Sequence, residues 1–152
     1  MLHVLVLHGP NLNLLGRREK SVYGTASLKT INAGIVKFAR KERMKVAIRQ
    51  SNLEGELVSW IQEANTKFDG IVINPAGYTH TSVAIRDAIA AVDIPAVEIH
   101  LTNIYKREEF RHHSYIAGVA LGQISGFGPA GYVLGLRALT EHLKSARTPS
   151  TR

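Results

Sequence analysis

The sequence predicts a single α/β domain built on a parallel sheet. Two observations indicate this fold class: short apolar runs alternate with segments whose apolar residues recur at helical spacing, and the first run, residues 2–7, is almost continuously apolar, as strands buried on both faces are. A chain of 152 residues fits one domain. We assign residues 1–143 to it, and expect the polar, basic residues 144–152 to form a disordered tail.

The strands follow from the apolar runs. Five segments are expected to be strands, and they comprise residues 2–7, 45–50, 70–74, 96–101 and 119–125. Residues 45–50 alternate between apolar and polar side chains, which favours an outer strand of the sheet.

The helices follow from a periodicity near 3.6 residues. The expected helices contain residues 28–39, 57–64, 81–92 and 130–144. Ser51 or Asn52 is the expected cap of the second helix, and Thr81 or Ser82 that of the third. Strands and helices therefore alternate in βαβ units, which favours a five-stranded, flavodoxin-like sheet with helices on both faces.

The composition excludes several classes of site. Because there are no cysteines, disulfides, thiolate metal sites and cysteine nucleophiles are all excluded. No apolar run approaches the roughly 18 residues of a membrane span. The first residues lack the basic lead and the small-residue cleavage site of a signal peptide. We therefore expect a cytoplasmic protein without a membrane partner.

The net charge of +7 raises the question of nucleic-acid binding. The basic residues are scattered, and no basic stripe with interleaved aromatic residues occurs, so no nucleic-acid partner is expected. A positive field suits a small anionic substrate equally well. A basic binding module without catalytic activity stays open as an alternative, and a direct enzymatic assay would separate the two.

Polar side chains gather where the predicted strands end. In open parallel sheets, ligands bind beyond the carboxyl ends of the strands. Three such ends carry Asn11, then Asn74 and His80, then Glu98, His100 and Thr102. This convergence predicts a site at the sheet's carboxyl edge. The helix expected to begin near residue 81 would offer free N–H groups to a carboxylate there.

The alternating segment at residues 97–102 places Glu98, His100 and Thr102 on one face. A glutamate two positions before a histidine can orient the imidazole as a proton donor. A buried structural ion pair is the alternative interpretation. The run at residues 107–114 is typical of an exposed charged turn, judged on its spacing alone.

The long segment at residues 9–24 does not have the spacing of a phosphate-binding loop. A flavin- or nucleotide-binding protein of the same fold class stays open as a second alternative, and a colourless purified protein would speak against flavin. The seven histidines include no grouping of the His-Glu-x-x-His kind, so no metal is expected.

Four motifs resemble the type II dehydroquinases. They are GPNLNLLGRRE at residues 9–19, NPAGYTHTS at 74–82, EIHLTN at 98–103 and REEFRHHS at 107–114. Their order and spacing match over about residues 2–143, and only the tail is left uncovered. Agreement at this level is highly specific to the family.

The resemblance implies a flavodoxin-like fold, a dodecamer arranged as a tetramer of trimers, and a reaction without a cofactor. It implies a hydro-lyase that converts 3-dehydroquinate into 3-dehydroshikimate by anti elimination through an enolate, with neither metal nor imine. The resemblance leaves open whether the enzyme serves aromatic biosynthesis or quinate breakdown.

The resemblance also implies the roles of individual residues. Tyr23 would remove the proton beside the ketone, and Arg18 would hold Tyr23 as tyrosinate. His100 would protonate the departing hydroxyl, Glu98 would orient His100, and Asn11 would position a water at the enolate oxygen.

The implied substrate-binding residues form a second group. In it, Asn74, His80 and Arg111 would hold hydroxyls, the backbone of Leu101 and Thr102 would hold the carboxylate, and Asp87 would reach a neighbouring subunit's site. Gly77 is a further candidate from the sequence itself, because a glycine in the turn after Asn74-Pro75 lets the backbone approach a ligand closely.

Overall fold

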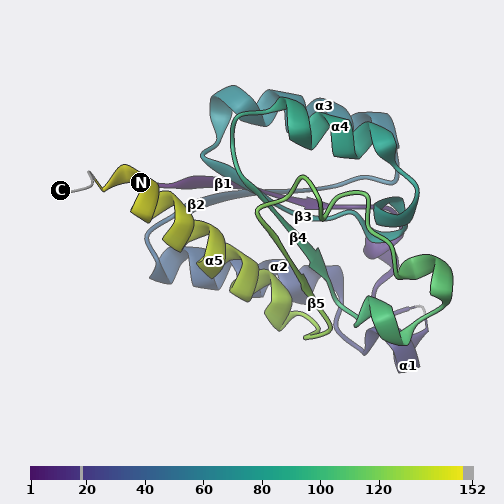
Figure 1. Cartoon of the computed structure of the whole chain (residues 1–152). Helices are drawn as coiled ribbons and strands as arrows, with labels where there is room; N and C mark the ends of the chain where they lie inside the picture. The colour runs from purple at the N-terminus through teal and green to yellow at the C-terminus, as the bar shows by residue number, and fades with distance from the viewer. Residues whose placement is uncertain (18, 149–152) are drawn as a thin grey trace.

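One parallel sheet organises the molecule (Figure 1). The computed structural model describes residues 1–17 and 19–148, without the side chain of Tyr23. The strands are β1 (His3–His8), β2 (Lys45–Gln50), β3 (Gly70–Asn74), β4 (Ala96–His100) and β5 (Gly122–Ser125). Their order, β2-β1-β3-β4-β5, confirms the predicted flavodoxin-like sheet and the outer position of residues 45–50.

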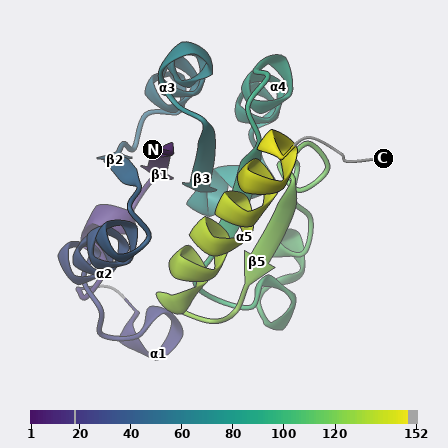
Figure 2. The same cartoon turned by 90° about the vertical axis from the view of Figure 1, so that its left-hand side faces the viewer.

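Helices cover both faces of the sheet, as predicted (Figures 1 and 2). On one face lie α2 (Leu28–Lys41) and α5 (Ala130–Arg147), and on the other lie α3 (Glu54–Lys67) and α4 (Val83–Ala91). Side chains of β1 divide between the two cores, because successive residues of a strand point to opposite faces. Val4 and Val6 pack into the core with α2 and α5. Leu5 and Leu7 pack into the core with α3 and α4.

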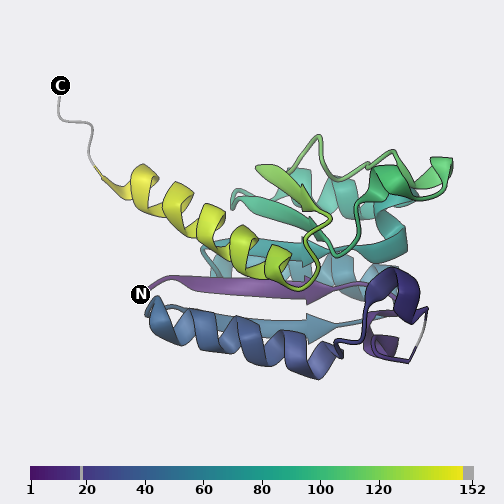
Figure 3. The ribbon, with the colours of Figure 1, turned by 90° about the horizontal axis from the view of Figure 1, so that it is seen from below.

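The carboxyl ends of the strands lie at one edge of the sheet, because all neighbouring pairs are parallel. The short helix α1 (Lys20–Tyr23) and the 3₁₀ helix Ala76–His80 follow these ends, and the segment after β4 contains two more 3₁₀ helices, Ile104–Lys106 and Glu109–Arg111. Figure 3 shows the segment after β4, in green, beyond the strand tips. Within the described part of the chain, no helix has the length and hydropathy needed to cross a membrane.

One of the two predicted helix caps is confirmed, and the other is wrong. Ser82 caps α4, and its hydroxyl accepts a hydrogen bond from the N–H of Ile85 at 2.9 Å. The prediction of Ser51 or Asn52 for α3 is wrong, because the capping position is occupied by Leu53. The Ser51 hydroxyl accepts instead from the N–H of Leu53, and the Asn52 side-chain oxygen accepts from the N–H of Asn11.

Two predicted boundaries also need correction. The last strand begins at Gly122 rather than at residue 119, because the N–H groups of Val119 and Ala120 donate to Ile116 in a turn. The last helix runs to Arg147, so residues 144–147 are helical rather than part of a disordered tail. Arg147 pairs with Asp69 at 2.7 Å and ties this last turn to the domain. Residues 149–152 lie outside the described residues.

Candidate active site

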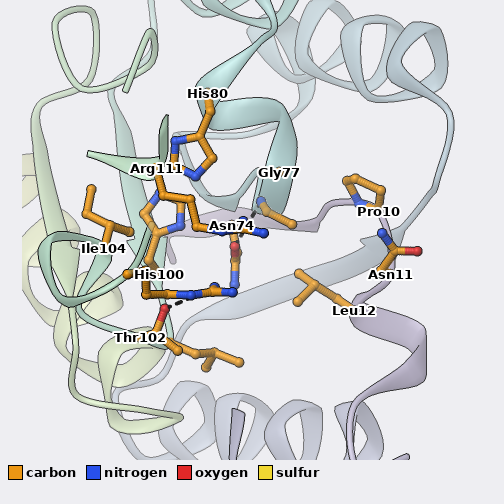
Figure 4. A pocket seen from close by; sticks show the side chains of 13 residues that line it. Pro10, Asn11, Leu12, Asn74, Gly77, His80, His100, Thr102, Ile104 and Arg111 are labelled. Atoms are coloured by element: carbon orange, nitrogen blue, oxygen red, sulfur yellow. Dashed lines mark hydrogen bonds between the residues drawn. The ribbon is translucent and has the colours of Figure 1, made fainter. Parts of the chain in front are cut away.

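A pocket opens at the carboxyl edge of the sheet (Figure 4). It is lined by Pro10, Asn11, Leu12, Asn74, Ala76, Gly77, His80, His100, Leu101, Thr102, Ile104, Arg107 and Arg111. The ends of β1, β3 and β4 therefore contribute to one hollow, as their polar residues predicted. In Figure 4, His80, His100 and Arg111 face Pro10, Asn11 and Leu12 across the pocket.

The pocket brings together most of the predicted site residues. Eight of them line it: Asn11, Asn74, Gly77, His80, His100, Leu101, Thr102 and Arg111. Glu98 lies behind His100 and is fully buried. Arg18 and the side chain of Tyr23 lie outside the described residues. Asp87 does not line the pocket; its side chain is 63% exposed on α4 and pairs with Arg86.

The loops of β1 and β3 approach each other closely at the pocket. The Gly9 N–H donates to the carbonyl of Asn74 at 2.8 Å. A Cβ atom at Gly9 would lie 2.4 Å from the carbonyl oxygen of Pro75, so only glycine fits here. Asn11 adopts a left-handed conformation with φ 68°, which asparagine tolerates better than most residues. These features hold Asn11 next to the β3 loop.

A buried carboxylate supports His100. Glu98 Oε2 is hydrogen-bonded to His100 Nε2, which confirms that the two side chains share a face of β4 and pair. The Thr79 hydroxyl donates to Glu98 Oε2 at 2.9 Å, and the Ser114 hydroxyl lies 2.8 and 2.9 Å from the two carboxylate oxygens. Among the described residues, only these three side chains bind the Glu98 carboxylate.

The charge of Glu98 follows from these contacts. Burial acts to raise the pKa of the Glu98 carboxyl, but hydrogen bonds from His100, Ser114 and Thr79 outweigh burial and hold this pKa below its ordinary value. Glu98 is therefore an anion near neutral pH. Its bond to Nε2 fixes the imidazole of His100, and Nδ1 has no bonding partner among the described residues.

His80 lies beside His100, with ring centroids 6.3 Å apart. Its Nδ1 donates to the carbonyl oxygen of His113 at 2.8 Å, which leaves Nε2 as the acceptor nitrogen of the neutral ring. Partial burial lowers the pKa of His80, although the His113 carbonyl acts in the opposite direction. A neutral His80 can therefore accept a hydrogen bond from a ligand hydroxyl.

The segment at residues 107–114 forms one wall of the site, so the interpretation as an exposed charged turn is wrong for part of it. Arg107 and Arg111 line the pocket, and Ser114 binds Glu98. Arg107 donates to the Thr102 hydroxyl at 3.5 Å, and Arg111 pairs with Glu108 at 2.7 Å. No local periodicity connects this segment to β4, so spacing alone missed Arg107 and Ser114.

The expected carboxylate seat at the start of α4 is not part of the pocket. Residues 81–83 do not line the hollow, and the Ser82 hydroxyl already accepts one of the helix's first N–H groups. Leu101 and Thr102 bring backbone to the pocket instead. A second hollow is also lined by Leu101 and Thr102, and it is bordered by Ser21 and Val22 of α1. Ser21 and Val22 therefore lie close to the pocket.

Two side-chain chemistries are missing from the described pocket. No lysine lines it, so its described side chains supply no amine for an imine with a ketone. No group of three or more His, Cys, Asp or Glu side chains suited to a metal ion occurs within residues 1–17 and 19–148.

His8 is a buried titratable residue next to this site. Its Nδ1 lies 2.8 Å from the Tyr132 hydroxyl, and its Nε2 lies 2.8 Å from Asn32 Oδ1. Burial lowers the pKa of His8 from 6.5 to about 4, although the hydrogen bond to Asn32 acts to raise it. His8 is therefore neutral in the folded protein near pH 7.

This lowered pKa predicts a pH-dependent stability. Between pH 6.5 and 4 the unfolded His8 binds more protons than the folded one, so stability is full above pH 6.5 and falls as the pH falls towards 4. At about 1.36 kcal/mol per pKa unit, the loss is about 3 kcal/mol at pH 4. Urea unfolding at pH 7, 5.5 and 4 should show a shallower decline for His8→Gln than for wild type. Parallel declines would contradict the assignment.

Comparison with known proteins gives a consistent result. A family model described as "Dehydroquinase class II" matches residues 2–140. A 3-dehydroquinate dehydratase of Nostoc sp. is 62% identical over 143 residues, which cover 94% of this chain and 97% of the relative. A 3-dehydroquinate dehydratase of Acaryochloris marina is 59% identical, with 93% and 95% covered.

Solved structures agree with the sequence comparison. The type II dehydroquinase from Butyrivibrio crossotus superposes with a TM-score of 0.90 at 45% identity, covering 91% of this chain and 97% of that one. The type II dehydroquinase from Propionibacterium acnes gives a TM-score of 0.87 at 39% identity, covering 95% and 97%. The chain is therefore similar to these proteins over almost its whole length and theirs.

Proposed function

The chain belongs to the class II dehydroquinase family, and we propose that its pocket binds 3-dehydroquinate and removes water from it to give 3-dehydroshikimate. The enzyme is thus a hydro-lyase with 3-dehydroquinate dehydratase activity. The single observation that carries the assignment of the site is the buried Glu98 carboxylate paired with His100 at the pocket wall. This pair is suited to proton donation at a position that a ligand can reach.

The pocket offers donors and acceptors that suit a polyhydroxylated acid. In the proposed complex, Asn74, His80 and Arg111 hold substrate hydroxyls, and the backbone of Leu101 and Thr102 holds the carboxylate. Support comes from the placement of all five residues in one hollow. Gly77 also lines it, and apart from its two chain neighbours no residue comes within 4 Å of the position of a Cβ there, so the backbone is open to a ligand.

The proposed reaction has two proton transfers. Tyr23, as tyrosinate, removes a proton from the carbon beside the ketone, and the electron pair of that C–H bond forms an enolate. A water held by Asn11 stabilises the enolate oxygen. The enolate then collapses and the C–O bond of the hydroxyl on the opposite face breaks. Protonated His100 gives its proton to this departing hydroxyl, which leaves as water. Exchange with solvent restores both residues, so the net loss is one water molecule.

Glu98 and Arg18 support these two groups. The Glu98 anion stabilises the positive charge of a protonated His100 and keeps its ring in place. We propose that Arg18 stabilises the tyrosinate of Tyr23, a role that rests on the family resemblance and on the closeness of α1 to residues 101 and 102.

We further propose that the enzyme works as a homododecamer, a tetramer of trimers, in the cytoplasm. In this assembly Asp87 reaches the site of a neighbouring subunit. Its exposed position on α4 is compatible with such a contact, and the absence of cysteines is compatible with a reducing compartment.

The activity is tested by following the absorbance of the conjugated enone product with purified protein and 3-dehydroquinate. We expect turnover that survives dialysis against EDTA, because no side-chain cluster suited to a metal ion occurs among the described residues. Turnover should also survive treatment with borohydride in the presence of substrate, because the described pocket lacks a lysine. Absence of product would overturn the proposed function. Inactivation by EDTA or by borohydride would overturn the proposed mechanism without metal or imine.

A further inference from the structure

The amide of Asn74 is held by protein on two sides. Asn74 is 2% exposed, although it lines the pocket. Its Oδ1 accepts the N–H of Ala76 at 3.1 Å, and its Nδ2 donates to the Tyr132 hydroxyl at 3.0 Å. The amide nitrogen carries two hydrogens. One is therefore taken by Tyr132, and the other remains for a ligand.

The side chain of Tyr132 reaches Asn74 from a helix that covers one face of the sheet. It lies on α5, is fully buried, and its hydroxyl lies 2.8 Å from Nδ1 of His8 on β1. Burial raises the pKa of the Tyr132 hydroxyl, so it remains a protonated donor. His8 in turn lies 2.8 Å from Asn32 of α2. Three elements of the scaffold thus meet behind one pocket residue.

These contacts have one consistent direction. Because Asn32 Oδ1 accepts, His8 carries its proton on Nε2, and Nδ1 is an acceptor. Tyr132 then donates to Nδ1, and its oxygen is left to accept from Asn74. The order Asn74, Tyr132, His8, Asn32 is called here the buried hydrogen-bond chain. If these hydrogen bonds ran in the opposite direction, Tyr132 and Asn74 would both have to exchange donor and acceptor roles.

We propose that Tyr132 and His8 are positioning residues for substrate binding, which hold the Asn74 amide with one N–H directed at a substrate hydroxyl. This inference rests on the proposed function, because it assigns Asn74 the role of a ligand contact. Neither Tyr132 nor His8 lines the pocket, so both act through Asn74.

The test is the substitution Tyr132→Phe, which removes one oxygen and keeps the buried ring. The Asn74 N–H then has no acceptor, and the amide is free to turn. Loss of one ordinary hydrogen bond corresponds to about a 3- to 10-fold fall in kcat/KM. We expect this fall to come from KM, with kcat nearly unchanged, because the contact holds substrate and transition state alike.

Thr140→Val is the matched control. Thr140 is also on α5 and buried, and its hydroxyl donates to the carbonyl of Leu136 at 2.7 Å. Both substitutions delete a buried hydroxyl from the same helix, but Thr140 has no contact with the buried hydrogen-bond chain. Thr140→Val should therefore lower the midpoint of thermal unfolding without changing KM.

A double-mutant cycle separates positioning from a general loss of stability. Adding Tyr132→Phe to Asn74→Ala should raise KM little beyond the value for Asn74→Ala alone. An unchanged KM in Tyr132→Phe, or additive effects in the cycle, would overturn the inference. If Tyr132→Phe does not fold, Asn32→Ala replaces it as the test, because Asn32 is the half-buried last residue of the buried hydrogen-bond chain. We expect a smaller rise in KM for Asn32→Ala, and an unchanged KM would overturn the inference. A wild-type protein without dehydratase activity would instead overturn the proposed function.

Discussion

Replacing Tyr23 by phenylalanine is expected to lower kcat by at least about 10²–10⁴-fold, which is the usual contribution of a general base. The phenyl ring keeps the shape of the side chain and removes the oxygen that we propose as the proton acceptor. Substrate binding should survive, because the proposed hydroxyl and carboxylate contacts come from other residues. Initial rates from product absorbance and a direct measurement of ligand binding check both parts.

The size of this effect depends on how a tyrosine becomes a base. A free tyrosine has a pKa near 10, so about 0.1% is ionised at pH 7. Lowering a tyrosine pKa by about three units requires roughly 4 kcal/mol at 1.36 kcal/mol per unit. One guanidinium about 4 Å away supplies roughly 4 kcal/mol at an effective dielectric constant near 20. A single arginine, proposed to be Arg18, is therefore sufficient in magnitude.

Tyr105→Phe is the control for Tyr23→Phe. Tyr105 is 65% exposed on the segment after β4, and it does not line the pocket. Its substitution removes the same hydroxyl group from the same residue type and should leave kcat unchanged. Near-wild-type turnover in Tyr23→Phe would remove Tyr23 from the mechanism.

Replacing His100 by alanine is the second change with a large expected effect. Net dehydration should fall by about 10²–10⁴-fold, because the departing hydroxyl loses its proton donor. In the proposed mechanism, removal of the proton beside the ketone does not require His100, so this proton should still exchange with deuterated solvent. Proton NMR of substrate in heavy water, run beside the absorbance assay, gives the two rates.

His113→Ala serves as the control for His100→Ala. The His113 side chain is exposed and packs against the ring of Tyr115, whereas its contact to His80 is made by the backbone carbonyl. The alanine variant keeps that carbonyl and should retain both rates. Equal losses of exchange and dehydration in His100→Ala would show that His100 is not the general acid that acts only in the second step.

The fold was predictable where local pattern and sheet topology agree. The apolar run at residues 2–7 and the periodicity of residues 28–39 lie in β1 and α2, because burial on a sheet requires those periods. The missed α3 cap and the late start of β5 depend on competing local hydrogen bonds, such as that between Ser51 and the Leu53 N–H. Spacing does not reveal which of two local partners a polar group takes.

The site was predictable where its residues follow the ends of strands. The ends of parallel strands must meet, so Asn11, Asn74 and His100 could be placed together from the sequence. Ser114 and Tyr132 were missed, because they reach Glu98 and Asn74 across 16 and 58 residues of chain. Contacts between distant segments depend on tertiary packing and leave no periodic signal in the sequence.

In the proposed mechanism, a base and an acid act on opposite faces of a substrate held at the sheet's carboxyl edge. The most direct test uses 3-dehydroquinate with deuterium in one of the two hydrogen positions beside the ketone, and mass spectrometry of the product. We expect deuterium on the face opposite the departing hydroxyl to be lost to solvent, and deuterium on the same face to be retained. Loss of the deuterium on the same face as the hydroxyl would contradict the proposed mechanism.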